Sequence, residues 1–451
     1  MSELVAAYRR RDLSPVEVTE EALTRIAELD RELHAFQTVT AGLAREQALQ
    51  AEAAYGRGET APLLGVPVSV KDVFDVRGVV TTLGSLVHRG DVAESDSGVV
   101  RRLRAAGAVI TGKTNTAEFG QSATTENLLG ADTRNPWDSA RTPGGSSGGA
   151  AASVAAGLST LAIGSDGGGS IRIPAAFTGL FGLKPTHGLC LDEGHFRAMT
   201  DFSSPGPLAW RTADARVLLG VLADRSYPAR PVARALRIAW CPQPEGRPVD
   251  RGVADLAAEA VVALEGLGHE VVATELPLAG WADIFGPLVL ADEHRERGHL
   301  LDADPAQLTD YARRALEAGR ALDPAEVERA RRDLPRFRGR IAGLFAHFDV
   351  LVTPTTAVPA FPLGERPRVI DGTRVDGLWG AVPFAVPFSV AGIPAATVPC
   401  RLSDGLPVGV QLAAPPLAEQ LLLDVSAQLE EALAFDATPV VERWALPHVS
   451  S

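Results

Sequence analysis

Cysteine is scarce in this chain of 451 residues, which contains three: Cys190, Cys241 and Cys400. Their odd number and wide spacing, without a C-x-x-C pair, argue against a disulfide framework and a zinc knuckle and favour a reducing compartment. No run of about 18 apolar residues occurs, so no membrane span is expected. The short apolar run at residues 4–8 precedes the arginines at 9–11, the reverse of the order in a signal peptide. We therefore expect a cytoplasmic protein without a membrane partner.

Positive charge is also in deficit, because 43 Lys and Arg face 56 Asp and Glu, for a net charge of −13. Such a surface repels phosphate backbones, so nucleic acid is not an expected partner. Apolar residues make up 46% and charged residues 22%, which excludes a wholly disordered chain. The 44 glycines and 32 prolines show no G-X-Y period, so collagen is excluded and a turn-rich fold is favoured.

Strand and helix patterns alternate along most of the chain. The residues Ser14-Pro15-Val16-Glu17 form a capping box with proline at the first helical position, which predicts a helix to about residue 29. A second helix over about 42–55 would complete an N-terminal helical layer spanning about 1–60. Further strands are predicted at 66–70, 108–111, 161–163, 236–240, 270–273 and 349–353, and further helices at 99–106, 150–156, 253–267 and 419–433. This alternation predicts the α/β class.

A charged segment over about 283–346 has a helical pattern interrupted at Asp304-Pro305, Asp323-Pro324 and Pro335. No repeat or low-complexity linker divides the chain. We therefore expect one large domain over 1–451, with the charged helices as a peripheral insertion.

Residues 107–114, Gly-Ala-Val-Ile-Thr-Gly-Lys-Thr, satisfy the P-loop pattern G-x-x-x-x-G-K-[ST]. A P-loop needs a strand before its first glycine and a helix after its last residue. Here a helix pattern precedes the motif and the strand candidate lies inside it, where Val109 and Ile110 favour extended structure. A nucleotide site is therefore only a remote alternative.

Two glycine-rich segments suggest serine chemistry. Residues 144–149, Gly-Gly-Ser-Ser-Gly-Gly, contain G-x-S-x-G centred on Ser146, but turn residues precede it where an α/β-hydrolase has a strand. Residues 164–170 read Gly-Ser-Asp-Gly-Gly-Gly-Ser, in which glycine amides can converge on one point, as an oxyanion hole requires. Considered alone, the first segment is more simply a flexible loop and the second a turn.

In combination, the motifs closely resemble the amidase signature family. The matching blocks begin at residues 64–72 (Leu-Gly-Val-Pro-Val-Ser-Val-Lys-Asp), continue through the two glycine-rich segments, and reach residues 182–186 (Gly-Leu-Lys-Pro-Thr). They resume at 352–355 and at 405–411. The resemblance implies a single α/β domain whose central twisted mixed sheet is covered by helices on both faces. It also explains the Gly-Lys-Thr match, since a strand ending in Gly-Lys-Thr-Asn recurs in this family.

The resemblance implies a Ser–cis-Ser–Lys triad, with Ser170 as the nucleophile, Ser146 as the serine on a cis peptide and Lys71 as the base. Lysine is a base only when neutral, and Lys71 follows an apolar run in which burial would favour that form. The resemblance further implies an oxyanion hole and a supporting shell, formed respectively by the amides of Gly167, Gly168 and Gly169 and by Asp166, Arg172, Ser165 and Ser147.

Substrate choice would lie outside the triad. Candidate segments are 118–121, 187–200 and 379–388, and the candidate binding residues are Glu118, Phe119, Gly120, Gln121, Trp379 and Phe384. An apolar pocket wall and ordinary core packing remain equally open for them. The expected substrate is a small amide or carbamate, with urethanase or esterase activity as an alternative. No metal or organic cofactor is expected.

A free-standing amidohydrolase, monomeric or homodimeric, is the favoured interpretation. The alternative is the glutaminase-type subunit of an amidotransferase complex. The tyrosine-rich segment typical of that subunit is not visible, because the comparable residues 308–330 are rich in Arg, Glu and Ala and contain Tyr311 alone.

Overall fold

The computed structural model describes residues 1–190, 192 and 199–446. Within these residues, eleven strands form one sheet in the order β1-β3-β2-β4-β6-β5-β12-β13-β9-β7-β8. The strands are β1 (Phe36–Val39), β2 (Pro67–Lys71), β3 (Val109–Thr114), β4 (Leu161–Asp166), β5 (Phe181–Lys184), β6 (Ser204–Ala209), β7 (Arg237–Trp240), β8 (Glu270–Ala273), β9 (Val350–Pro354), β12 (Ala395–Ser403) and β13 (Leu406–Ala413). Strands β3, β2 and β4 are parallel, as are β9, β7 and β8, and the central strands are antiparallel. The sheet is therefore mixed. A separate ribbon pairs β10 (Val369–Ile370) with β11 (Thr373–Arg374).

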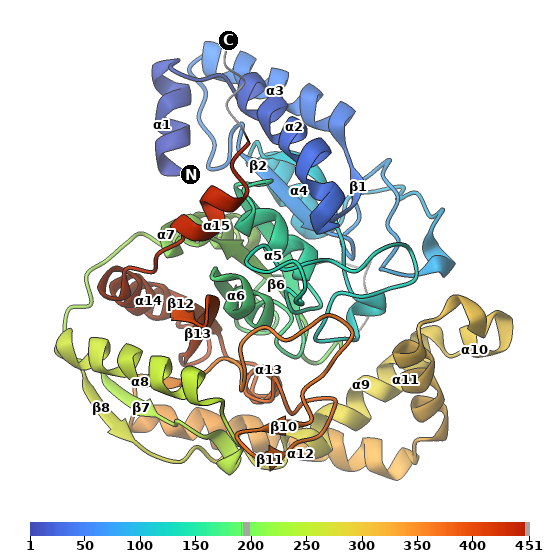
Figure 1. Cartoon of the computed structure of the whole chain (residues 1–451), viewed down its shortest axis with the longest axis vertical. Helices are drawn as coiled ribbons and strands as arrows, with labels where there is room; N and C mark the ends of the chain where they lie inside the picture. The colour runs from blue at the N-terminus through green and yellow to red at the C-terminus, as the bar shows by residue number, and fades with distance from the viewer. Residues whose placement is uncertain (191, 193–198, 447–451) are drawn as a thin grey trace.

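Helices cover both faces of this sheet (Figure 1). They are α1 (Ser2–Arg10), α2 (Pro15–Leu33), α3 (Ala41–Gly56), α4 (Gly98–Ala105), α5 (Gly148–Ala155), α6 (Arg172–Thr178), α7 (Thr212–Ala223), α8 (Arg251–Gly266), α9 (Trp281–Arg297), α10 (Leu300–Ala303), α11 (Asp310–Ala321), α12 (Pro324–Gly343), α13 (Val386–Val390), α14 (Glu419–Leu433) and α15 (Thr438–Arg443). Helices α4, α7, α8 and α14 share a core with one face, and α5 and α6 pack on the other. The fold is a single α/β domain, as the sequence predicts.

Side-chain alternation along the central strands separates the two cores. In β4, Leu161 and Ile163 join the core under α4 and α7, whereas Ala162 faces α5. In β9, Val350 and Val352 join the first core and Leu351 joins the one beneath α9 and α12. Because both faces are buried, these strands consist mostly of apolar residues, which is why their positions were predictable.

The N-terminal layer contains a strand that the sequence pattern does not reveal. Helix α2 begins at the predicted capping box, in which the Ser14 hydroxyl accepts from the Glu17 amide and the Glu17 carboxylate accepts from the Ser14 amide. Between α2 and α3, strand β1 adds to the edge of the sheet against β3. Its four residues are half-buried or exposed, so they lack the apolar alternation that marks a strand.

Helices α9 to α12 form the charged segment, at the right and bottom of Figure 1. Its predicted interruption at Pro335 is wrong, because α12 continues through that residue. Pro335 is exposed, while Leu334, Phe337 and Ile341 anchor the helix against the core on both sides of it. Packing on both sides of the proline thus compensates for the missing backbone donor. Among the described residues, no helix is long and apolar enough to cross a bilayer.

The P-loop alternative is wrong, because Gly112, Lys113 and Thr114 lie in strand β3 rather than in a phosphate-binding loop. The buried Lys113 Nζ donates to Asp72 Oδ1 at 2.6 Å and to Thr81 Oγ1 at 2.8 Å. This lysine therefore has internal partners and holds strand β3 against the end of β2.

Candidate active site

The ends of two adjacent parallel strands carry the first candidate residues. Lys71 is the last residue of β2, and Asp166 is the last residue of β4. Because the carboxyl ends of parallel strands meet at one edge of a sheet, the two residues lie close together. The loop before α5 brings Ser146 to this edge, and the loop before α6 brings Ser170.

Lys71 is fully buried and lies against two serine hydroxyls. Its Nζ is 2.7 Å from Ser146 Oγ and 2.9 Å from Ser165 Oγ. Burial lowers the pKa of Lys71 from 10.5 to about 7, and the nearby charge of Asp166 opposes this only in part. A neutral amine is therefore accessible near neutral pH, which an ordinary lysine would not provide.

The loop carrying Ser146 has its shape fixed by close contacts. The Gly145–Ser146 peptide bond is cis. A Cβ on Gly145 would lie 2.2 Å from the carbonyl oxygen of Thr124, so only glycine fits there. Ser147 joins this loop to its neighbours, because its hydroxyl donates to the Ser165 carbonyl at 3.2 Å and its amide donates to the Ser170 carbonyl at 3.2 Å.

Ser170 lines a cavity and is 8% exposed. Within the described structure its hydroxyl makes no hydrogen bond, although its main-chain carbonyl is bound to Ser147. The serine is thus held by its backbone, while its hydroxyl remains available to a bound molecule.

The glycine segment differs from its predicted role at one position. The amide of Gly169 donates to Asp166 Oδ1 at 2.7 Å, so it is not free to bind an oxyanion. Gly169 has a φ of +112°, and a Cβ there would lie 2.7 Å from both Ala385 and Ile173. Its role is therefore to turn the chain. The amides of Gly167 and Gly168 donate to no backbone carbonyl or side chain in the described residues.

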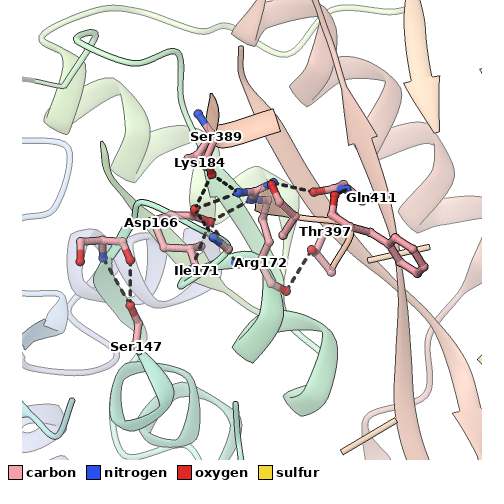
Figure 2. A network of polar contacts seen from close by, with 12 residues as sticks. Ser147, Asp166, Ile171, Arg172, Lys184, Ser389, Thr397 and Gln411 are labelled. Atoms are coloured by element: carbon pink, nitrogen blue, oxygen red, sulfur yellow. Dashed lines mark hydrogen bonds and ion pairs between the residues drawn. The ribbon is translucent and has the colours of Figure 1, made fainter. Parts of the chain in front are cut away.

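Asp166 and Arg172 form a fully buried bidentate ion pair, shown in Figure 2. Arg172 Nε and Nη2 each donate to one Asp166 oxygen at 2.8 Å. The remaining guanidinium bonds reach Ala385 O, Gln411 Oε1 and Ser389 Oγ at 2.6–2.8 Å. Because burial opposes the charge of Asp166 and the Arg172 cation favours it, the net result is a carboxyl pKa below its usual value. The pair anchors the glycine segment to α13 and β13.

A second buried lysine, Lys184 at the end of β5, lies beside this network (Figure 2). Its Nζ donates to the Pro185 carbonyl at 2.8 Å. Burial, helped by the Arg172 cation, lowers the pKa of Lys184 to about 7. Two lysines near the glycine segment therefore titrate in the same pH range, although only Lys71 contacts Ser146.

The cavity beside Ser170 has a volume of about 720 Å³. Its apolar lining consists of Ala123, Ile173, Met199, Phe285, Val289, Leu290, Ala315, Ala318, Leu378 and Trp379. Of the predicted binding residues, Gly120, Gln121 and Trp379 line this cavity. The charged segment is more than peripheral here, since α9 and α11 form part of the wall.

Glu118, Phe119 and Phe384 do not line the cavity, so the structure does not support them as binding residues. The Glu118 carboxylate is buried and accepts from Ser85 Oγ at 2.6 Å and from the Thr309 amide at 2.7 Å. Phe119 and Phe384 are each packed inside an apolar core.

Several cavity residues carry no sequence signal. Phe285 lies on α9 and Tyr311 and Arg314 on α11, whereas Arg366 and Arg368 come from the loop between β9 and β10. Most of the candidate segment 187–200 (residues 191 and 193–198) lies outside the described residues. In the part of the chain that is described, no three His, Cys, Asp or Glu side chains gather as a metal site.

Comparison with known proteins agrees with this geometry. Residues 17–423 match the protein-family model Amidase. AmiB2 of Mycobacterium tuberculosis (strain H37Rv), described as an amidase, is 40% identical over 426 residues, covering 91% of each chain. The glutamyl-tRNA(Gln) amidotransferase of Acidothermus cellulolyticus contributes a relative that is 38% identical over 95% of this chain and 93% of its own. The crystal structure of a bacterial aryl acylamidase of the amidase signature family superposes with a TM-score of 0.90, at 27% identity over 99% of this chain and 98% of the other.

The fold and the buried Ser–Ser–Lys cluster thus define an amidase-type protein. The chain belongs to the Amidase family, which supports hydrolysis of a carbon–nitrogen bond.

Proposed function

We propose that this chain is a free-standing amidohydrolase that cleaves an amide through an acyl-enzyme on Ser170. The observation that carries the proposal is the contact of 2.7 Å between the buried Lys71 Nζ and Ser146 Oγ, next to a cavity that Ser170 lines. A serine hydroxyl needs a base to become a useful nucleophile, and a buried neutral amine supplies one.

In the proposed reaction, Ser170 attacks the amide carbonyl while its proton passes to Ser146. Ser146 passes its own proton to the neutral Lys71, whose second contact to Ser165 holds the amine in place. The same relay then protonates the leaving amine. A water molecule, deprotonated by the relay in turn, releases the acid and restores the serine.

The oxyanion would be bound by the amides of Gly167 and Gly168, because the Gly169 amide already serves Asp166. One preorganised donor contributes about 2.7–4 kcal/mol to such a transition state. The cationic Arg172 holds this segment in place without reaching the cavity itself, since its guanidinium is fully buried among acceptors. We assign Asp166 and Arg172 a positioning role.

Hydrolysis of hexanoyl 4-nitroanilide, hexanamide and phenyl N-methylcarbamate tests the proposal and separates amidase from urethanase activity. The apolar cavity wall and the likeness to an aryl acylamidase favour the anilide. Ser170→Ala should reduce turnover at least about 1,000-fold, because the remaining groups cannot form the acyl-enzyme.

The matched control is Ser153→Ala, which removes a buried serine whose hydroxyl donates to the Ala150 carbonyl. It should keep turnover within a few-fold of the parent. A folded Ser170→Ala protein with full activity would refute the assignment, as would an absence of turnover on every substrate.

The glutaminase component of an amidotransferase is a second candidate, favoured by the likeness to the Acidothermus amidotransferase chain over nearly the whole sequence. Tyr311 does not distinguish the two, because its hydroxyl is occupied internally: it donates to the Glu126 carbonyl at 2.9 Å and accepts from the Glu118 amide. Size-exclusion chromatography and a glutaminase assay separate the candidates. Ammonia release from glutamine that depends on an added partner would favour the amidotransferase component; hydrolysis of an anilide by the isolated monomer or homodimer would favour the free enzyme, which we place in the cytoplasm.

A further inference from the structure

The cavity that Ser170 lines combines an apolar wall with charged groups. Among its described lining residues, three are arginines: Arg314 on α11, and Arg366 and Arg368 on the loop between β9 and β10. Two are acids, Glu126 and Asp310. The whole chain has a net charge of −13, so guanidinium groups gathered at one cavity are not a sample of the average surface.

Both acids already have cationic or hydrogen-bonding partners. Asp310 Oδ1 accepts from Arg313 at 3.0 Å, and this contact lowers the pKa of the Asp310 carboxyl. Glu126 Oε1 lies 3.8 Å from Arg366 and accepts from Thr124 Oγ1 at 2.9 Å. Neither carboxylate is therefore left to attract a cation into the cavity.

Arg366 is held in place mainly by neutral groups. Its Nη2 donates to Ser122 Oγ at 2.6 Å and to Thr124 Oγ1 at 3.2 Å, and both residues are buried. Neutral hydroxyls orient the guanidinium without cancelling its charge, and the Glu126 contact of 3.8 Å does so only weakly. The group thus stays cationic and fixed.

The other two arginines are less occupied. Within the described residues, neither Arg314 nor Arg368 forms an ion pair or a side-chain hydrogen bond. Arg314 acts at longer range, since its charge contributes to the lowered pKa of Asp310. The Arg368 guanidinium lies over Gly377, where an added Cβ would come within 2.2 Å of Nη1. These two guanidinium groups have free donors for a ligand.

Building on the proposed amidase function, we propose that the substrate is an amide that carries a carboxylate at the end remote from the scissile bond, separated from it by an apolar segment. Guanidinium and carboxylate match in geometry and can form two parallel hydrogen bonds. The apolar wall, with Phe285 and Trp379, would contact the intervening segment. Arg314, Arg366 and Arg368 would then be specificity-determining residues for the carboxylate.

Three 4-nitroanilides that differ only at the far end of the acyl chain test this directly: the adipic acid monoanilide, the hexanoyl anilide and the 6-aminohexanoyl anilide. They place a carboxylate, a methyl group and an ammonium group at the same position. We expect kcat/KM to be about 10-fold higher for the carboxylate than for the methyl group, and lower still for the ammonium group. Raising the salt concentration should reduce these differences.

A second pair of substrates covers the leaving-group side, with butyryl amides of 4-aminophenylpropanoate and of 4-propylaniline. A carboxylate preference in either set supports the inference and shows which end of the substrate contacts the arginines. The variants Arg314→Gln and Arg368→Gln should each lower the carboxylate-to-neutral ratio of kcat/KM about three-fold or more. Both side chains are exposed and make no ion pair in the described structure, so these variants should fold.

The matched control is Arg320→Gln, which removes the same charge from α11 at a residue that pairs with Asp302 and does not line the cavity. Its ratio should equal that of the parent. Equal kcat/KM for charged and neutral substrates in both sets, with Ser170→Ala still inactive, would overturn this inference and leave the amidase proposal intact. Loss of selectivity in Arg320→Gln to the same extent as in Arg314→Gln would also overturn it.

Discussion

The lowered pKa of Lys71 predicts how activity depends on pH. The proposed relay needs a neutral amine, so kcat/KM should rise through a pKa of about 7 and level off above it. The difference between 10.5 and about 7 corresponds to roughly 5 kcal/mol in favour of the neutral form. An exposed lysine would instead give activity that still rises beyond pH 9.

The expected profile is steep on its acid side. Each pH unit below about 7 should lower kcat/KM about ten-fold, so about one hundredth of the plateau should remain near pH 5. Release of 4-nitroaniline from hexanoyl 4-nitroanilide measures this, because the substrate has no ionising group in the range. Circular dichroism at each pH establishes that the protein stays folded.

Lys184 provides the control, since its pKa is also lowered to about 7 but its Nζ donates to Pro185 rather than to Ser146. In Lys184→Met the acid limb should remain near pH 7, whereas Lys71→Met should lose most of its activity. A limb that disappears in Lys184→Met while the protein stays folded, or a flat profile from pH 5 to pH 9, would refute the assignment of Lys71 as the base.

Two further substitutions test positioning residues. Arg172→Met should lower the free energy of unfolding by about 3–5 kcal/mol and abolish activity, because it leaves the buried Asp166 without its cation; thermal unfolding followed by calorimetry measures this, and an unchanged melting temperature would contradict it. Glu118→Gln should lower the melting temperature with little change in KM, because the carboxylate binds Ser85 and Thr309 rather than the cavity; a large rise in KM at unchanged stability would show that Glu118 contacts substrate after all.

Much of the fold could be predicted because its signals are local. The capping box at Ser14 fixes the start of α2, and the amphipathic pattern predicts α14 with the bounds that it has, Glu419–Leu433. Strand β1 was not predictable from its own residues, since pairing with β3 rather than burial makes it a strand. Pro335 misled for a related reason: tertiary contacts hold α12 together where local propensity predicts a break.

The candidate site divides in the same way. Ser146, Ser170 and Lys71 could be named because glycine-rich loops and an apolar strand end mark them within short stretches of sequence. The cavity could not, because its members meet only in the folded chain: Arg366 contacts Ser122, which is 244 positions earlier. Glu118 looked like a binding residue because a carboxylate near a motif has the same sequence signal whether it faces a ligand or a buried threonine.

The five side-chain hydrogen bonds of Arg172 have a consequence for how the enzyme comes into being. Three of them end on Ala385, Ser389 and Gln411, up to 239 positions further along the chain. A nascent polypeptide that stops short of these residues therefore holds the catalytic serine but not the acceptors that secure its loop. Hydrolytic competence should thus arise late in synthesis, and a truncated product should be unable to cleave amides even if its first half acquires secondary structure.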